Sequence, residues 1–373
     1  MNSKIKILQI GMTPNLGGVE AYIMNMYRKI NRQNVQFDFI NWYEDQDLAY
    51  SEEIRELGGK VFNIKSRSKN IVSNYVDLNS IIRNGDYQYV YYNVNSLSDI
   101  TGMRSVLELP GTQLIVHAHN DSIGQNQLVT KALHKLHKSF MKKDIFRFAC
   151  SQNAGKWMFG ENEFTIIPDA IDVEQFKFDI DQRNICRKYL KLGLKTVYGC
   201  IARFSPQKNH KFLIDIFAEI HKRDTNTFLL LVGEGYLKTE IQQKINKLNL
   251  ADSVMFLGMR NDINFLLQAI DVMIAPSVYE GFGISVLEAQ CAGVCCYVSD
   301  IFNDEIMQTP IIMKIGLHKS AEEWAIQIIN NQAKLNYCER KAYSLEIKNK
   351  GYDINSIALN MEKVFLNNVR SKN

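Results

Sequence analysis

Short apolar runs rich in β-branched residues alternate with amphipathic stretches along nearly the whole chain, and this alternation occurs twice. The amphipathic stretches repeat apolar residues at the spacing of one helical face, as at Val19, Ile23, Met26 and Ile30. Such alternation indicates parallel sheets with helices on both faces. The strands expected from it cover residues 5–10, 35–40, 88–92, 113–116 and 146–150, and then 197–201, 228–232, 254–257, 272–275 and 295–298.

The doubling of this pattern predicts two domains. The chain has 373 residues, and a single core usually stops growing at about 250–300 residues. We expect an α/β fold of two doubly wound, Rossmann-like domains, residues 1–170 and 171–352, facing each other across a cleft. Residues 353–373 are expected to form a C-terminal helix that could pack on either domain, including back on the first. Ligands of such sheets bind beyond the carboxyl ends of the strands.

Composition excludes several classes of protein. The formal net charge is +4, from 44 basic and 40 acidic residues, which argues against a dedicated nucleic-acid binder. No apolar run approaches the roughly 20 residues of a membrane-spanning helix, and the charged first strand is unlike a signal peptide. The 7 cysteines lack the paired spacing of a zinc site. We therefore expect a cytoplasmic protein with reduced thiols.

Two loops carry groups suited to phosphate. Gly17 and Gly18 follow the first strand at the start of a helix, where backbone N–H groups and the helix dipole favour an anion. Arg203 and Lys208 follow the first strand of the second series and offer a planar guanidinium and a point charge. Taken singly, each loop has an ordinary alternative, a glycine-rich turn or a pair of solvated cations.

The loop after the expected strand at 272–275 is the most informative. Glu280 and Glu288 lie eight residues apart and flank a Gly-Phe-Gly turn that opens a helix. Glu288 falls about one and a half turns into that helix, among apolar residues where a carboxylate is uncommon. A carboxylate can accept hydrogen bonds from two neighbouring hydroxyls of a ribose or hexose. A structural salt bridge is the alternative.

Taken in order, these residues resemble the retaining GT-B glycosyltransferases of the group 1, or family 4, type. Bacterial exopolysaccharide and capsule sugar transferases look most similar, and the resemblance covers nearly the whole chain. Its second half rests on Arg203, Lys208, Gly233-Glu-Gly235, Phe256-Leu-Gly258, Pro276-Ser277, Glu280-Gly-Phe-Gly and Glu288. Its first half rests on Gly17-Gly18, His117-Ala-His119-Asn and Ile167-Pro-Asp169-Ala-Ile-Asp172.

The resemblance implies a role for each matched residue. Arg203 and Lys208 would bind the donor diphosphate and stabilise the leaving group, and Glu288 would hold the ribose hydroxyls. Glu280 would hold the donor sugar, with the base lying against the backbone near residues 258–260. The implied catalytic residues are His119, Arg203, Lys208 and Glu280. The implied donor-binding residues are Gly17, Gly18, Arg203, Lys208, Gly258, Met259, Glu280, Gly281, Phe282, Gly283, Ile284 and Glu288.

Two details of the first half remain open. His119 best matches the family's active-site histidine, because Asn and a short polar residue follow it, and His117 stays as the alternative. The family's Asn-Gly between the domains is Asp169-Ala170 here, which we expect to alter a turn without touching the chemistry. No metal or other cofactor is expected, because Arg203, Lys208 and helix N-termini can compensate an anionic leaving group.

A possible membrane surface lies between residues 128 and 148. Lysines recur there at helical spacing on one face, and apolar residues recur on the opposite face. The ordinary explanation is a surface helix packed by its apolar side. The alternative is that the lysines meet anionic lipid headgroups on the inner face of the cell membrane. The two sets are Lys131, Lys135, Lys138 and Lys142, and Val129, Leu133, Leu136 and Phe140.

The resemblance and the loops together favour a retaining, metal-independent glycosyltransferase. We expect it to move a sugar from a UDP- or GDP-linked donor to a hydroxyl of a growing, lipid-linked bacterial surface glycan. Two alternatives stay open because fold does not fix function. One is a nucleotide-sugar epimerase of the same fold, and the other is a non-catalytic nucleotide-binding subunit of a polysaccharide assembly complex.

Overall fold

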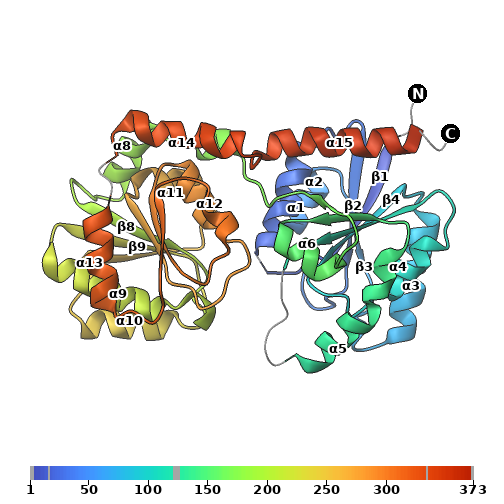
Figure 1. Cartoon of the computed structure of the whole chain (residues 1–373), viewed down its shortest axis with the longest axis horizontal. Coiled ribbons are helices and arrows are strands. Elements are labelled where there is room, and N and C mark those ends of the chain that lie inside the picture. The colour runs from blue at the N-terminus through green and yellow to red at the C-terminus, as the bar shows by residue number, and fades with distance from the viewer. Residues whose placement is uncertain (1–3, 16, 121–126, 333–334, 371–373) are drawn as a thin grey trace. The chain divides into compact units, whose positions relative to one another are not determined.

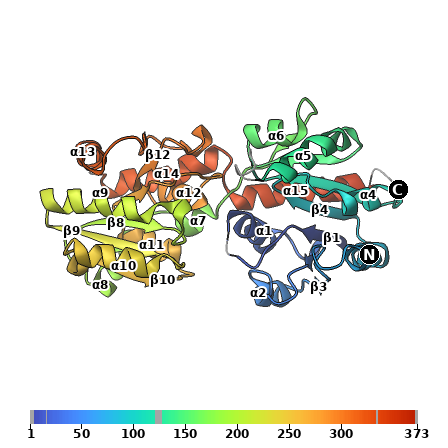
Figure 2. The same ribbon diagram turned by 90° about the horizontal axis from the view of Figure 1, so that it is seen from below.

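The computed structural model describes residues 4–15, 17–120, 127–332 and 335–370, with the side chains of 368–370 left out. The chain divides into two compact units. The first comprises Met1–Ala170 and Ile354–Asn373, and the second comprises Ile171–Asp353. Each unit contains one parallel sheet with helices on both faces (Figures 1 and 2).

The sheet of the first unit is 7-stranded, in the order β3-β2-β1-β4-β5-β6-β7, and its neighbouring strands pair in parallel. Its strands are β1 (Ile5–Ile10), β2 (Val35–Asn41), β3 (Val61–Asn63), β4 (Tyr89–Val94), β5 (Gln113–Ala118), β6 (Phe146–Ala149) and β7 (Thr165–Ile166). Its helices are α1 (Gly18–Lys29), α2 (Ser51–Glu56), α3 (Ile71–Asn84), α4 (Thr101–Leu107), α5 (Leu128–His137), the 3-10 helix η1 (Lys138–Lys142), α6 (Gln152–Phe159) and α15 (Ile354–Arg370).

The sheet of the second unit is 6-stranded, in the order β10-β9-β8-β11-β12-β13, again with parallel neighbours. Its strands are β8 (Thr196–Ile201), β9 (Thr227–Val232), β10 (Val254–Gly258), β11 (Val272–Ala275), β12 (Cys295–Ser299) and β13 (Ile312–Ile315). Its helices are α7 (Val173–Phe176), α8 (Ile180–Tyr189), α9 (His210–Arg223), α10 (Lys238–Lys247), α11 (Ile263–Ala269), α12 (Ile284–Cys291), α13 (Ala321–Asn331) and α14 (Tyr337–Asn349), with 3-10 turns η2 (Pro206–Lys208), η3 (Ala251–Ser253) and η4 (Asp304–Ile306).

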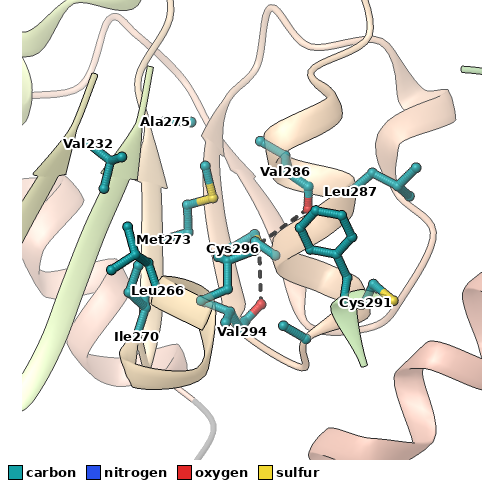
Figure 3. Packing of buried hydrophobic residues seen from close by; sticks show 14 of the residues in the cluster. Val232, Leu266, Ile270, Met273, Ala275, Val286, Leu287, Cys291, Val294 and Cys296 are labelled. Atoms are coloured by element: carbon teal, nitrogen blue, oxygen red, sulfur yellow. Dashed lines mark hydrogen bonds between the residues drawn. The ribbon is translucent and has the colours of Figure 1, made fainter. Parts of the chain in front are cut away.

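Each sheet separates two apolar cores, because successive side chains of a strand point to opposite faces. In β1, Ile7 packs with the core beneath α1, whereas Leu8 packs with the core on the other face. In β12, Cys296 belongs to one core of the second unit and Cys295 to the other. Figure 3 shows Val286 of α12 beside Met273 of β11 and Cys296 of β12 in the first of these cores.

The C-terminal helix α15 packs in the first unit, beside α1 (Figure 1). Its apolar face, including Ile354, Met361 and Phe365, is buried in the same core as α1. The Tyr89 hydroxyl of β4 donates a hydrogen bond of 3.0 Å to the Phe365 carbonyl. Among helices of the described residues, none is long and apolar enough to cross a membrane.

The expected fold class is confirmed, since both units are Rossmann-like and their strands follow the order of doubly wound sheets. Three strands were not expected from the sequence: β3, β7 and β13. Each lies at the edge of its sheet, and β3 and β7 contain only 3 and 2 residues. Such short edge strands carry too few residues for an alternating pattern to be visible.

Candidate active site

The candidate donor site lies at the carboxyl edge of the second sheet. The strand order reverses between β8 and β11, and in open α/β sheets ligands bind at such a switch point. A small pocket opens there, lined among others by Ala202, Lys208, Ser277, Glu280 and Gly283. The two loops of the second unit that the sequence singled out, after β8 and after β11, therefore meet at one place.

The loop after β8 presents Arg203 and Lys208. Arg203 is exposed, and Lys208 ends the turn η2. Gly233 and Gly235 shape this loop, because a Cβ on either would overlap the carbonyl oxygen of Ala202 or Phe204. Both glycines also have positive φ, at 133° and 158°, so that other residues would be strained there.

The loop after β11 is tied to the loop after β8. The Val278 N–H donates a 2.8 Å hydrogen bond to the Gln207 carbonyl. The Lys208 ammonium forms an ion pair with the Glu280 carboxylate, and both side chains are largely buried. This pair fixes the direction of both side chains before any ligand binds.

The Gly-Phe-Gly turn starts helix α12. Phe282 is buried and stacks on Tyr352, with ring centroids 5.6 Å apart. Gly283 is the N-cap of α12 with φ of 89°, and a Cβ there would lie 2.6 Å from the Phe302 ring. Only glycine fits this position without strain. The first N–H groups of α12, including that of Ile284, lack acceptors within the helix and can face an anion.

Glu288 lies one turn further along α12, on the same partly exposed face as Ile284 and Ser285. The neighbouring residues Val286 and Leu287 are buried in the core. Burial raises the pKa of Glu288 to about 8, and no described basic side chain forms an ion pair with it. The structural salt bridge considered as an alternative is therefore not observed among the described residues.

Gly258 and Met259 complete this edge of the sheet. Gly258 ends β10 with φ of 68°, and its carbonyl accepts a 2.8 Å hydrogen bond from Gly233 N–H. Met259 is exposed. An ion pair of 2.6 Å with Asp262 raises the pKa of the next residue, Arg260. The backbone expected to lie against the base is thus joined to the loop after β9, and that loop is joined to the loop after β8 by a 2.9 Å hydrogen bond from Phe204 N–H to the Glu234 carbonyl.

The glycine loop of the first unit follows β1. Gly17 is the N-cap of α1, and Glu20 in the first turn of α1 is buried. The Glu20 carboxylate accepts hydrogen bonds from the Thr13 N–H at 3.0 Å and the Thr13 hydroxyl at 2.7 Å. This closure of the loop by its own carboxylate was not expected from the sequence.

Both candidate histidines are buried at the end of β5. His117 Nδ1 lies 2.8 Å from the Tyr91 hydroxyl, and burial, reinforced by His119, holds its pKa well below the usual value. His119 Nε2 lies 3.0 Å from Asn93 Oδ1, and His119 Nδ1 lies 3.4 Å from Asp169 Oδ1. Asp169 therefore does more than shape a turn, contrary to our expectation.

The hydrogen bonds around Asn93 define where His119 carries protons. The Asn93 amide nitrogen donates to Gln9 Oε1 at 2.9 Å and to the Ile10 carbonyl at 3.3 Å. Its oxygen must then accept from His119, which places a proton on Nε2. His119 Nδ1 and Asp169 Oδ1 are both buried, and neither atom has a hydrogen-bond partner among the described residues. Together with Cys150, these groups place three ligand atoms within 4.8 Å of one another, so the geometry also admits a metal ion.

A larger hollow lies at the carboxyl ends of β1 and β4 in the first unit. Its volume is about 600 Å³. Aromatic side chains line it, among them Trp42, Tyr43, Tyr75 and Tyr92, and they alternate with amides and hydroxyls. An ion pair between Arg67 and Asp99 also lies in its wall. No single motif pointed to this hollow, because its residues come from several loops.

The lysine-rich segment differs from its expected form. Helix α5 ends at His137, and Lys138 and Lys142 belong to the 3-10 turn η1, so the four lysines do not share one helical face. The buried side of α5 is formed by His134. Val129 and Leu136 are 73% and 69% exposed, whereas Phe140 is buried, so the apolar side packs inward only in part.

Comparison with known proteins agrees with this geometry. Residues 181–345 match the family described as glycosyl transferases group 1. Over 95% of this chain and 94% of the relative, the sequence is 29% identical to a putative glycosyltransferase, EpsF, of Bacillus subtilis (strain 168). Over 80% of each, it is 26% identical to the UDP-Gal:alpha-D-GlcNAc-diphosphoundecaprenol alpha-1,3-galactosyltransferase of Escherichia coli.

The fold is also similar to that of solved structures. The crystal structure of Anabaena HepE in complex with UDP and glucose has a TM-score of 0.76 at 19% identity, covering 97% of this chain and 100% of HepE. The two Rossmann-like sheets and the family match over residues 181–345 lead to one conclusion. The chain carries a group 1 glycosyltransferase domain on a GT-B fold and is a glycosyltransferase.

Proposed function

We propose that this glycosyltransferase moves a sugar, with retention of anomeric configuration and without a metal, from a UDP- or GDP-linked donor to a lipid-linked glycan. The acceptor belongs to bacterial polysaccharide synthesis at the cytoplasmic face of the membrane. One observation carries the proposal: Lys208, Glu280 and the first turn of α12 converge at one edge of the second sheet, and Glu288 follows one turn along the same helix. The name of the Escherichia coli relative, with its UDP-linked donor and diphosphoundecaprenol acceptor, supports the choice of substrates.

Charge compensation of the leaving diphosphate is the main catalytic task. Lys208 is held by Glu280, and Arg203 is exposed in the same loop after β8, so that both cations are available to the phosphates. The N-terminus of α12 adds backbone N–H donors to the same place. Preorganised donors and charges of this kind stabilise a developing anion without a metal. The acceptor hydroxyl attacks from the face that the diphosphate leaves.

Glu288 binds the ribose of the donor. Its carboxyl group lies on the partly exposed face of α12, and burial raises its pKa to about 8. Two ribose hydroxyls would donate hydrogen bonds to the carboxylate and favour the ionised form. The bound nucleotide thus supplies the partners that the protein does not provide.

The hollow at β1 and β4 supports a glycan acceptor. Flat aromatic side chains such as Trp42 and Tyr75 offer apolar faces to sugar rings, and Asn95 offers hydrogen bonds to hydroxyls. Pockets of this size hold ligands of the size of a few sugar rings. Sequence motifs did not reveal this acceptor site, and we assign it from the structure.

The exposed face of α5 supports attachment to the membrane surface. Lys131 and Lys135 are exposed beside Leu128, Val129 and Leu136, which are exposed as well. Apolar side chains flanked by lysines are typical of helices that lie in the headgroup region of anionic membranes. A lipid-linked acceptor would be presented at that surface.

Nucleotide binding by Glu288→Ala tests the donor assignment. Thermal shift and calorimetry with UDP, GDP and their sugar conjugates should identify one preferred nucleotide for the wild-type chain. In Glu288→Ala, the loss of two hydroxyl contacts to a carboxylate should weaken binding of the preferred nucleotide by about tenfold or more. Exposed Asp252, replaced by Asn, is the matched control. Unchanged nucleotide affinity in Glu288→Ala would refute the ribose assignment, and loss of sugar transfer in EDTA would refute the metal-free mechanism.

A further inference from the structure

A second and larger hollow lies at the opposite edge of the second sheet. Its volume is about 870 Å³. It is lined by Thr196 and Cys295, which begin β8 and β12, and by Asp271, which directly precedes β11. Since Arg203 and Glu280 follow the carboxyl ends of β8 and β11, this hollow is separated from the donor site by the length of the strands.

The wall of this hollow is strongly cationic. Asp271 is the one carboxylate among its described lining residues. Asp271 lies 2.5 Å from Arg183, 3.2 Å from Arg187 and 4.0 Å from Arg340. Three guanidinium groups therefore share a single negative charge. The cations of the wall are Arg183, Arg187, Lys188, Lys191, Lys195 and Arg340.

Part of this charge has a structural purpose. Arg340 donates hydrogen bonds of 3.1 Å to the carbonyls of Ile270 and Ala292, and Arg187 donates one of 3.0 Å to the carbonyl of Ala269. These carbonyls lie at the ends of α11 and α12, where the helix dipole is negative. Capping explains why arginines gather at this edge, but it does not involve Lys188 or Lys191.

The positive charge remains in excess after capping. The Arg340 side chain is 5% exposed, and burial, with the neighbouring Arg183, lowers its pKa to about 9. Burial also lowers the pKa of Arg187. A lowered pKa means that the surroundings disfavour the positive charge. An anion bound in the hollow would favour the charged forms of both guanidinium groups.

We propose that this hollow is a second binding site of the chain, selective for a small polyphosphate anion such as the polyphosphate group of a nucleotide. Lys188 and Lys191 are exposed at its wall and supply mobile charges to the phosphates. Arg183 and Arg340, whose N–H groups largely donate to carbonyls and to Asp271, contribute fixed positive charge to the wall. The volume is that of pockets that enclose small-molecule ligands.

Binding of inorganic tripolyphosphate to the full-length chain tests this site. The donor site is first disabled by Arg203→Ala with Lys208→Ala, so that this experiment does not depend on the proposed function. Calorimetry should still show one site for tripolyphosphate. On that background, Lys188→Gln with Lys191→Gln should weaken binding by about tenfold or more, as expected for lost charge-assisted hydrogen bonds.

The control replaces Lys222 and Lys247, two exposed lysines of the same unit outside the hollow, by glutamine. These changes should alter the affinity by less than about twofold, because exposed charges far from a ligand are screened. Circular dichroism of each variant verifies that it is folded. Absence of binding to the donor-disabled chain, or equal weakening by the control pair, would overturn the proposal.

Discussion

The pH dependence of stability offers a direct test of the unusual environment of Glu288. Its side chain lies against the core of the second unit, and burial raises its pKa to about 8. In the unfolded chain, a glutamate titrates at about 4.3. Replacing Glu288 by glutamine keeps the shape of the side chain and removes the titration. The variant should therefore lose a component of the pH dependence that the wild-type chain has.

The sign and size follow from linkage. Because the folded pKa is raised, the protonated carboxyl contributes stability that is fully present below the unfolded pKa and lost as the pH rises through 8. Each pH unit in this interval removes about 1.4 kcal/mol, and less as the folded group itself ionises. Between about pH 6 and pH 8, the wild-type chain should lose about 2 kcal/mol relative to Glu288→Gln.

Urea unfolding at these two pH values measures the effect. Because the chain has two units, the transition to follow is the one that Glu288→Gln shifts. Asp252→Asn, at an exposed carboxylate of the same unit, should leave the pH dependence unchanged. UDP affinity is a second readout, since binding that favours the carboxylate should strengthen with pH in the wild-type chain alone. Equal pH dependence of unfolding in the wild-type chain and in Glu288→Gln would show that the carboxyl group is not held in an apolar site.

Three further changes probe other parts of the structure. Asp169→Asn, which removes the carboxylate 3.4 Å from His119 Nδ1, should lower the rate of sugar transfer with little change in nucleotide affinity; an unchanged rate of transfer would exclude a role for this contact. Gly283→Ala should destabilise the chain by about 1–3 kcal/mol, through a strained positive φ, and weaken nucleotide binding, as melting and calorimetry would show. Lys131→Glu with Leu136→Ser should abolish co-sedimentation with anionic vesicles; undiminished binding would exclude the exposed face of α5 as the lipid contact.

The sequence predicted the sheets and the loops after β8 and β11 because both depend on local pattern. Ten strands can be predicted from apolar runs between helical stretches. The segment from Glu280 to Glu288 comprises nine consecutive residues, so its pattern is visible in the sequence. The ion pair between Lys208 and Glu280 joins residues 72 positions apart. It became visible only because the strand order places β8 beside β11.

The sequence did not predict which side of some elements faces the core. The apolar residues of α5 seemed suited to a core, but the neighbouring loop is held instead by hydrogen bonds from Leu97 to His134, at 3.1 Å, and from His137 to Leu97, at 2.7 Å. Because these hydrogen bonds place His134 and His137 against the loop, the Leu136 side chain is exposed to solvent. The contact between Asp169 and His119 joins residues 50 positions apart, so no local sequence pattern predicts it.

Two partly buried carboxylates of the second unit, Asp271 and Glu288, differ in whether the protein itself supplies their partners. Asp271 lies within 4.0 Å of three guanidinium groups and accepts a 2.8 Å hydrogen bond from Val197 N–H, so the fold satisfies it completely. Glu288 lies in the same unit, and no described basic side chain pairs with it. A buried charge without partners destabilises a protein, so packing alone gives no reason for a carboxyl group there. Under the proposed function, hydroxyl donors from a bound ribose would supply that reason, with Glu288 one turn after the first N–H groups of α12 and the phosphates of the ligand at Lys208.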